Sequence, residues 1–161
     1  MNVFEYAMKM ELDGKAYYEK LALETENAGL KTILTNLAAD EQKHYETFKA
    51  LKGGMSAQVA ESWTLENNKN LFERLIADKA ASATLVKSLD GYRHGMENEA
   101  ESAKFYEDAA KKEGNAEVAT LLLRIAAEER DHYRILENLY QYTLAPENFL
   151  AWGEFSNLKE L

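Results

Sequence analysis

Two short segments each place a histidine three residues after a glutamate. They read DEQKHYE at residues 40–46 and EERDHYR at residues 128–134. Residues three apart share one face of a helix, so Glu41 points the same way as His44, and Glu129 the same way as His132. Carboxylate and imidazole groups together bind iron, manganese or zinc. Because both pairs interrupt apolar helix faces, they predict ligand chemistry inside the protein.

The second segment copies the first, because the chain repeats itself at an offset of 88 residues. Residues 1–52 and 89–140 align without a gap and are identical at 15 positions. The repeat also aligns two further pairs of polar residues, which are Glu11 with Glu99 and Tyr18 with Tyr106. Two helical hairpins of the same design are therefore predicted.

The spacing of these residues predicts that they lie at one height in a bundle. If the first hairpin turns near Asn27, Glu11 lies 16 residues before the turn, and Glu41 and His44 lie 14 and 17 residues after it. At a rise of about 1.5 Å per residue, these offsets differ by only a few ångströms along the axis. The second hairpin, turning near Asn115, repeats the same spacing. One layer of six ligand-type side chains follows, made of Glu11, Glu41, His44, Glu99, Glu129 and His132.

Four buried carboxylates in one layer require positive charge nearby. Without it they would repel one another or take up protons, because each unpaired buried charge costs several kcal/mol. No lysine or arginine is repeated on these helix faces. Two divalent metal ions carry four positive charges, which would balance the four negative charges of the glutamates beside two neutral histidines. This charge balance predicts a dinuclear site for iron or manganese, and zinc would also bind.

The elements that must hold this layer are long helices. The chain contains a single proline and is rich in Ala, Leu, Glu and Lys, which favours an all-α fold. We expect one domain over residues 1–161, built as a four-helix bundle with one long crossover. Its predicted parts are a hairpin at 1–52, the crossover at 53–81, a hairpin at 82–142 and a tail at 143–161.

Composition excludes several classes of function. The net charge is −9, which disfavours nucleic acid and anionic membrane surfaces as partners. The chain has no cysteine, so thiolate metal sites and disulfides are excluded. No run of apolar residues is long enough to span a bilayer, and the first residues lack the basic start and apolar run of a leader, so we expect neither a membrane span nor a leader. A cytoplasmic location is expected.

The chain resembles the rubrerythrins and related ferritin-like di-iron carboxylate proteins. The motifs that carry the resemblance are MELDGKAYYE, DEQKHYE, ENEAESAKFYE and EERDHYR. The resemblance implies a ferritin-like four-helix bundle in which the six residues of the layer bind two iron ions. It also places Tyr18 and Tyr106 near the metals, where their hydroxyls can hydrogen-bond to the carboxylates.

The resemblance further implies an oxidoreductase that reduces hydrogen peroxide or dioxygen. Two departures bear on this expectation. The positions three residues either side of Glu99 are Met96 and Ser102, so a seventh carboxylate usual in rubrerythrins is missing. Because the sequence contains no cysteine, we also expect it to lack the rubredoxin domain of that family and to receive electrons from an external donor such as a rubredoxin-like protein. The alternatives are an iron-binding, ferroxidase or storage protein, and an interaction module whose metal pair is structural.

Other polar residues near the motifs are expected to have minor roles. Asp40 and Glu128 precede the ligand glutamates, and we expect them to face solvent or at most to hydrogen-bond to a ligand. His94 aligns with Tyr6 in the repeat and is expected to be peripheral. Bundles of this kind often pair through an exposed helix face, so a homodimer is expected.

Overall fold

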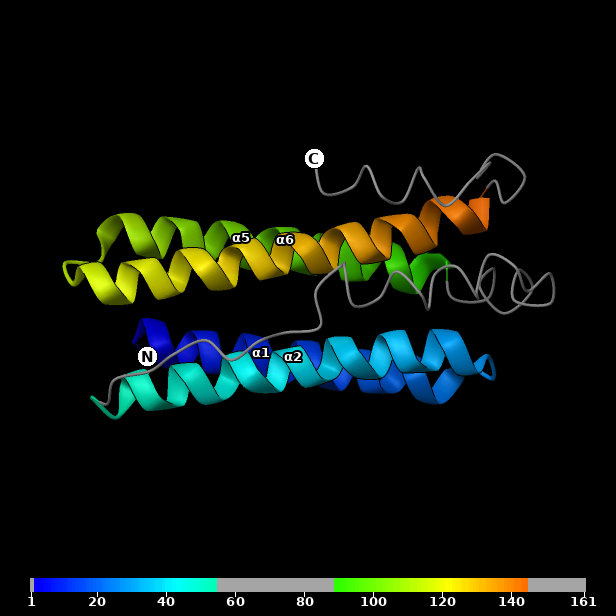
Figure 1. Cartoon of the computed structure of the whole chain (residues 1–161), viewed down its shortest axis with the longest axis horizontal. Coiled ribbons are helices and arrows are strands. Elements are labelled where there is room, and N and C mark those ends of the chain that lie inside the picture. Colours follow the sequence, from blue (N-terminus) through cyan, green and yellow to red (C-terminus); the bar gives the residue numbers. More distant parts are fainter. Residues whose placement is uncertain (1, 55–88, 145–161) are drawn as a thin grey trace.

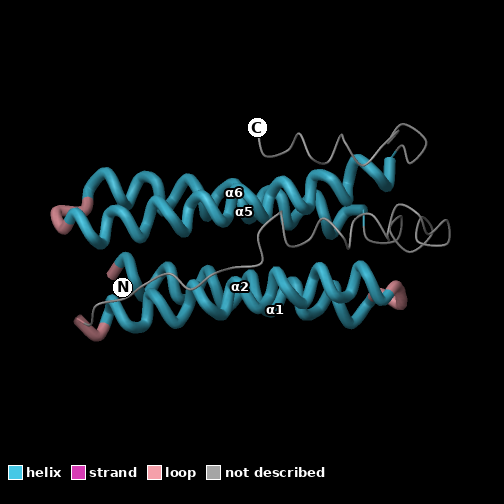
Figure 2. Tube along the Cα trace, viewed as in Figure 1, coloured by secondary structure: helices cyan, strands magenta, loops and turns pink. Residues whose placement is uncertain are grey.

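The fold consists of long helices arranged as two hairpins. The computed structural model describes residues 2–54 and 89–144, and over these ranges it contains helices and loops without any strand (Figure 2). The helices are α1 (Val3–Glu24), α2 (Ala28–Lys52), α5 (Leu89–Lys112) and α6 (Ala116–Leu144). The all-α prediction is confirmed for these residues. The expected extension of the third helix back to residue 82 lies outside the described residues, as do 55–88 and 145–161.

Asparagine side chains fix where three of the helices begin. Asn2 accepts a hydrogen bond from the backbone N–H of Glu5, whose carboxylate accepts one from the backbone N–H of Asn2 in return. Asn27 caps α2 by accepting from the N–H of Leu30, and Asn115 accepts from the first turn of α6. Such caps satisfy N–H groups that have no partner inside the helix. Both predicted turns are therefore confirmed, and the same residue type starts the second helix of each hairpin.

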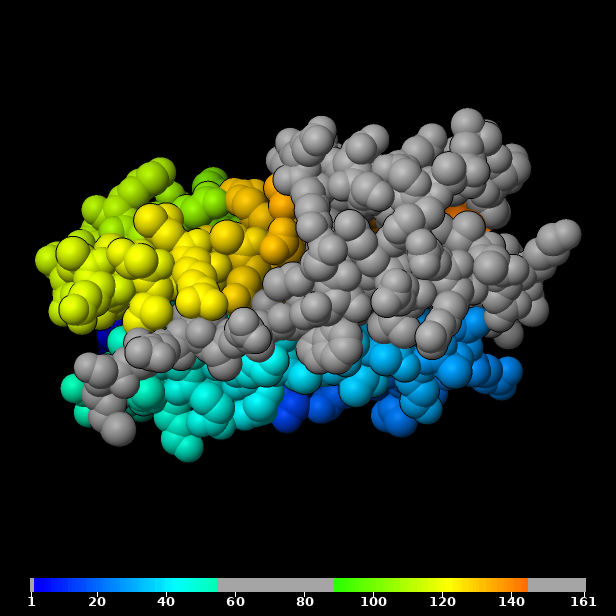
Figure 3. Space-filling model, in the orientation of Figure 1, coloured from blue at the N-terminus to red at the C-terminus, as the bar shows by residue number. Residues whose placement is uncertain are grey.

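The hairpins lie side by side with their turns at opposite ends of the bundle (Figure 1). The end of α2 and the start of α5 also lie at opposite ends of the bundle. The predicted crossover at 53–81 lies outside the described residues except for its first two positions. The hairpins are related by an approximate two-fold axis, as expected from a repeat of 88 residues. In Figure 3, α2 and α6 lie toward the viewer, with α1 and α5 behind them.

Two apolar clusters fill the bundle and leave a polar layer between them. The larger cluster lies toward the turn at Asn27 and includes the fully buried Leu30, Ile33 and Leu34. The smaller one surrounds Phe48 near the other end. Met96 is partly buried against the larger cluster, and Met8 against the smaller one. None of the described helices combines the length and apolar character that a bilayer crossing requires.

Candidate metal centre

Six buried side chains from all four helices meet in the polar layer. Glu11 comes from α1 and Glu99 from α5, while α2 and α6 each supply one glutamate and one histidine. None of the six is more than 4% exposed. The layer predicted from residue spacing is therefore assembled as expected, and its members are Glu11, Glu41, His44, Glu99, Glu129 and His132.

The six residues form two overlapping groups that could each hold one metal ion. In each group, one ligand atom from every residue lies within 4.8 Å of the others. The first group is Glu11, Glu41, His44 and Glu129, and the second is Glu41, Glu99, Glu129 and His132. Glu41 and Glu129 belong to both groups. They are therefore placed to bridge two ions, whereas Glu11 with His44 and Glu99 with His132 would each serve one ion.

Each histidine is oriented by a carboxylate from the opposite hairpin. The Nε2 atom of His44 lies 2.5 Å from Oε2 of Glu128, and that of His132 lies 3.0 Å from Oδ2 of Asp40. An ionised carboxylate accepts hydrogen bonds, so Nε2 carries the proton in both rings. The Nδ1 atoms are then free to bind a metal, and such carboxylate partners typically fix the ring and strengthen the ligand.

The expectation that Asp40 and Glu128 face solvent is wrong. Asp40 is fully buried and Glu128 is 9% exposed, and the alternative of a hydrogen bond to a ligand is the one observed. The physical reason is helix geometry, because a residue four positions before a histidine lies one turn away on nearly the same face. The sequence already contained this spacing, because Asp40 lies four residues before His44 and aligns with Glu128 in the repeat. Each carboxylate instead reaches across to the histidine of the other hairpin.

The atoms left without a hydrogen bond in the layer are those that would bind metal. The buried atoms in the layer that make no hydrogen bond are Oε2 of Glu11, Oε1 of Glu41, both carboxylate oxygens of Glu129, and Nδ1 of His44 and His132. Nδ1 of His44 lies 3.1 Å from Oε1 of Glu129, and Nδ1 of His132 lies 3.0 Å from Oε1 of Glu41. Buried polar atoms normally have partners. The unpaired set of oxygen and imidazole nitrogen atoms therefore fits two divalent ions.

Two tyrosines hold the outer glutamates from the neighbouring hairpin. The hydroxyl of Tyr18 donates a hydrogen bond to Oε1 of Glu99, and that of Tyr106 donates to Oε1 of Glu11. Both tyrosines are buried, and the two bonds are related by the internal repeat. Burial, together with the nearby carboxylates, raises the pKa of each tyrosine well above its ordinary value. The hydroxyls therefore stay protonated and donate hydrogen bonds to the carboxylates, as the family resemblance implied.

The pKa values of four of the six residues in the layer are raised above their ordinary values. Burial and repulsion from Glu129 raise the pKa of Glu99 to about 8. Burial and the surrounding carboxylates also raise the pKa of Glu41 well above its ordinary value. Burial by itself lowers the pKa of His44 and His132, but the nearby carboxylates outweigh it and raise both values well above the ordinary range. A metal ion would have to displace these protons.

A cavity connects the layer to the surface between α1 and α5. Its volume is about 330 Å³, and its walls include Tyr17, Tyr18, Glu41 and Glu99. His94, predicted to be peripheral, lies at this cavity with its side chain 62% exposed and its ring packed against Tyr17. It belongs to neither metal-binding group. His94 is therefore peripheral to the layer, as predicted.

Comparison with known proteins identifies one family. A model of the rubrerythrin family matches residues 2–140, which span both hairpins and include all six residues of the layer. Neither the curated proteins nor the solved structures gave a match to this chain. Rubrerythrins usually have a seventh carboxylate one turn from the glutamate that corresponds to Glu99. In this chain the positions one turn either side of Glu99 are Met96 and Ser102, and neither belongs to a candidate metal-binding group.

Proposed function

The chain belongs to the rubrerythrin family, and we propose that it is a di-iron oxidoreductase that reduces hydrogen peroxide or dioxygen. The observation that carries the proposal is the pair of overlapping four-residue groups that share Glu41 and Glu129. Their ligands are oxygen and nitrogen atoms without thiolate, which suits iron, although manganese or zinc could occupy the same positions. Electrons would come from an external donor such as a rubredoxin-like protein. We expect a cytoplasmic enzyme, and a homodimer remains a prediction.

When bound, a reduced iron pair supplies two electrons, which together with two protons convert one hydrogen peroxide molecule to two waters. The protein contributes the geometry that makes this exchange specific. Asp40 and Glu128 keep each imidazole turned so that Nδ1 faces the centre. Tyr18 and Tyr106 hold Glu99 and Glu11, so that the outer ligands do not swing away from the layer. Rigid support of this kind keeps donor atoms in place while the charge on the centre changes.

Apolar packing at both ends of the bundle excludes water from the layer, whereas the cavity between α1 and α5 admits water from one side. The apolar clusters lie on either side of the six ligands along the bundle axis. The cavity between α1 and α5 reaches Glu41 and Glu99 from the surface. Tyr18 lines this cavity and donates to Glu99, so its hydroxyl joins the cavity to a ligand carboxylate. We infer that substrate and protons enter on this side.

Anaerobic mixing of the ferrous protein with peroxide tests the proposal. The absorbance of the oxidised centre should appear rapidly, and addition of a reduced rubredoxin-like protein should remove it and allow repeated turnover. The dioxygen reaction can be followed in the same way. Binding of two iron ions per chain without re-reduction would contradict an enzyme of this kind.

The same experiment separates the alternatives. Retention of many more than two iron ions per chain would favour a storage or ferroxidase role. A metal pair that stays colourless and redox-silent would favour a structural role in an interaction module. Elemental analysis of protein purified without added metal identifies the ion that the site takes up.

A further inference from the structure

The cavity between α1 and α5 is built by both halves of the repeat. Its walls contain pairs of residues that align at the offset of 88, among them Met10 with Asn98 and Gly14 with Ser102. It therefore lies close to the approximate two-fold axis of the bundle. A feature formed by equivalent positions of both hairpins belongs to the design of the bundle and is not a local packing defect.

The cavity ends at one of the two metal positions. Glu41 and Glu99 line it, and both belong to the group completed by Glu129 and His132. Neither the other outer glutamate, Glu11, nor Tyr106, which donates a hydrogen bond to it, lines the cavity. A molecule in the cavity would therefore approach the position of Glu99 and His132.

Glycine at position 14 keeps the inner end of the cavity open. A Cβ atom on Gly14 would lie 3.1 Å from Oε2 of Glu41, closer than an ordinary van der Waals contact. Any larger side chain would press on the carboxylate and occupy the space in front of it. The small Ser102 takes the equivalent place on α5. Two small residues thus border the approach to the ligands.

The cavity is much larger than hydrogen peroxide requires. Its volume of about 330 Å³ is about ten times the roughly 30 Å³ that one water molecule occupies in the liquid. It falls in the range of pockets that bind small organic molecules, about 300–1,000 Å³. Tyr6, Tyr17 and Met10 supply apolar wall surface. None of the described residues that line it is a lysine or an arginine, so an anionic group would find no strong cation there.

We propose that this cavity binds the organic part of an uncharged hydroperoxide, which is reduced at the position of Glu99 and His132. The proposal rests on the function proposed above and adds a substrate class to it. In the reaction the O–O bond breaks, and the hydroperoxide takes two electrons from the reduced iron pair and two protons from solvent. The products are one alcohol and one water. The external donor then returns the two electrons to the iron pair.

The first test compares three substrates on the iron-loaded wild-type protein. We expect cumene hydroperoxide, which is uncharged, to be reduced with a kcat/KM at least comparable to that for hydrogen peroxide. A fatty-acid hydroperoxide, whose carboxylate is ionised, should be a poorer substrate than cumene hydroperoxide. Binding is measured separately by titration calorimetry with 2-phenyl-2-propanol, the alcohol that cumene hydroperoxide yields. This readout does not depend on turnover.

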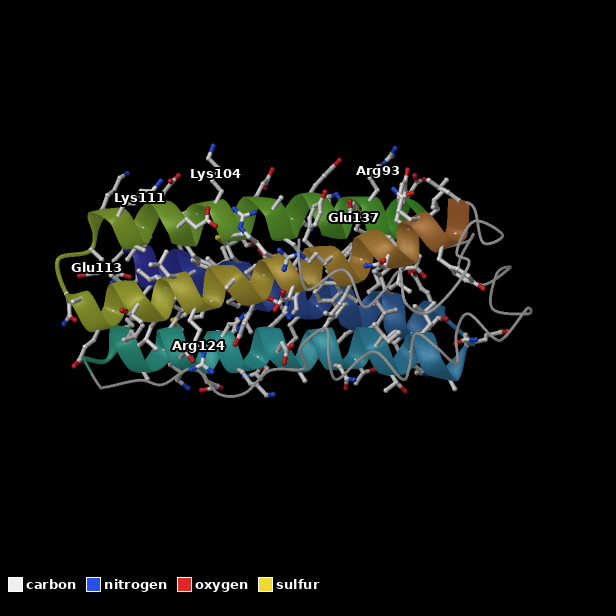
Figure 4. The ribbon with its side chains drawn as sticks, turned by 45° about the horizontal axis from the view of Figure 1, so that its top comes forward. Arg93, Lys104, Lys111, Glu113, Arg124 and Glu137 are labelled. Carbon is white, nitrogen blue, oxygen red and sulfur yellow. The ribbon has the colours of Figure 1, made fainter. Side chains whose placement is uncertain are left out.

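The second test fills the cavity. Ser102→Leu should lower the ratio of kcat/KM for cumene hydroperoxide to that for hydrogen peroxide by about tenfold or more, and should weaken binding of the alcohol. Lys104→Leu adds the same side chain to the same helix, where Lys104 points away from the bundle (Figure 4), and should leave both quantities unchanged. Should Ser102→Leu lose its iron, Asn98→Leu fills the cavity from one turn earlier on α5 and is measured in its place.

The outcomes separate this inference from the proposed function. Reduction of hydrogen peroxide without reduction of cumene hydroperoxide would overturn the inference and leave the function intact. A fatty-acid hydroperoxide that reacts faster than cumene hydroperoxide, or an unchanged ratio in the filled variant, would also overturn it. If the iron-loaded protein reduces no peroxide at all, both ideas are wrong.

Discussion

Replacing Asp40 by asparagine should weaken one metal position and spare the other. The fully buried Asp40 accepts a hydrogen bond from Nε2 of His132 at 3.0 Å, and Lys43 lies 3.6 Å from its other oxygen. An amide can still accept this bond, but it lacks the charge that makes such bonds about twice as strong. It can also turn its NH₂ group toward the ring and favour the wrong tautomer, in which Nδ1 is protonated.

The expected loss is about 10–100-fold in affinity at the position of Glu99 and His132, which corresponds to about 1.4–2.7 kcal/mol. Glu128→Gln should cause a loss of the same order at the position of Glu11 and His44, because Glu128 lies 2.5 Å from Nε2 of His44. Either single variant should therefore bind its two ions in two separate steps. The double variant should be weak at both positions.

Competition between the protein and a chromophoric chelator for Zn²⁺ or Co²⁺ measures both constants. Asp131→Asn is the matched control, because Asp131 adjoins His132 in sequence but pairs with Arg134 at 2.9 Å. It makes the same chemical change without touching a ligand, and its affinities should match those of the wild type. Wild-type affinities in Asp40→Asn, or an equal loss in the control, would refute the view that these carboxylates support the ligands.

Further predictions concern the ligands, the metal, the protons and a helix cap. His44→Ala and His132→Ala should each abolish stoichiometric binding of two ions, whereas His94→Ala should not; equal loss in all three, measured by elemental analysis, would mean that the ligands are misassigned. Removing metal with a chelator should lower the melting temperature, because ions that bind only the folded state stabilise it; an unchanged melting curve would argue against a bound pair. Metal binding at pH 7 should release protons, since burial raises the pKa of Glu99 to about 8 and neighbouring carboxylates raise those of both histidines in the layer. Affinity should accordingly increase as the pH rises toward 8, and a titration in weak buffer with a pH indicator would show the release or its absence. Asn27→Ala should cost about 1 kcal/mol through loss of the cap on α2, or about 2–4 °C in melting temperature, without altering metal content.

The layer of six side chains could be predicted from the sequence because helix geometry is regular. The rise per residue and the period of 3.6 residues convert the positions of Glu41 and His44 into one face at one height. The repeat then places the same residue types at the same distances from a second turn, with Asn27 and Asn115 at the equivalent turns. The need to balance the charge of four buried carboxylates added the prediction of two metal ions.

The partners of these residues across the bundle could not be read from the sequence. Helix periodicity places Asp40 near the face of His44, but it gives no reason for Asp40 to bind His132 of the other hairpin. That choice depends on how two hairpins approach each other, which is set by the packing of many side chains. The same holds for Tyr18, whose bond to Glu99 joins α1 to α5.

The sequence by itself determined the all-α class, the two equivalent hairpins and the six residues that converge between them, because these follow from local periodicity and charge balance. Only the tertiary structure decided that Glu41 and Glu129 belong to both candidate metal-binding groups, that each histidine is held by a carboxylate of the opposite hairpin, and that a cavity opens beside Glu99. These features depend on distances between separate helices. Such distances are set by long-range packing, which the spacing of residues along one helix does not encode.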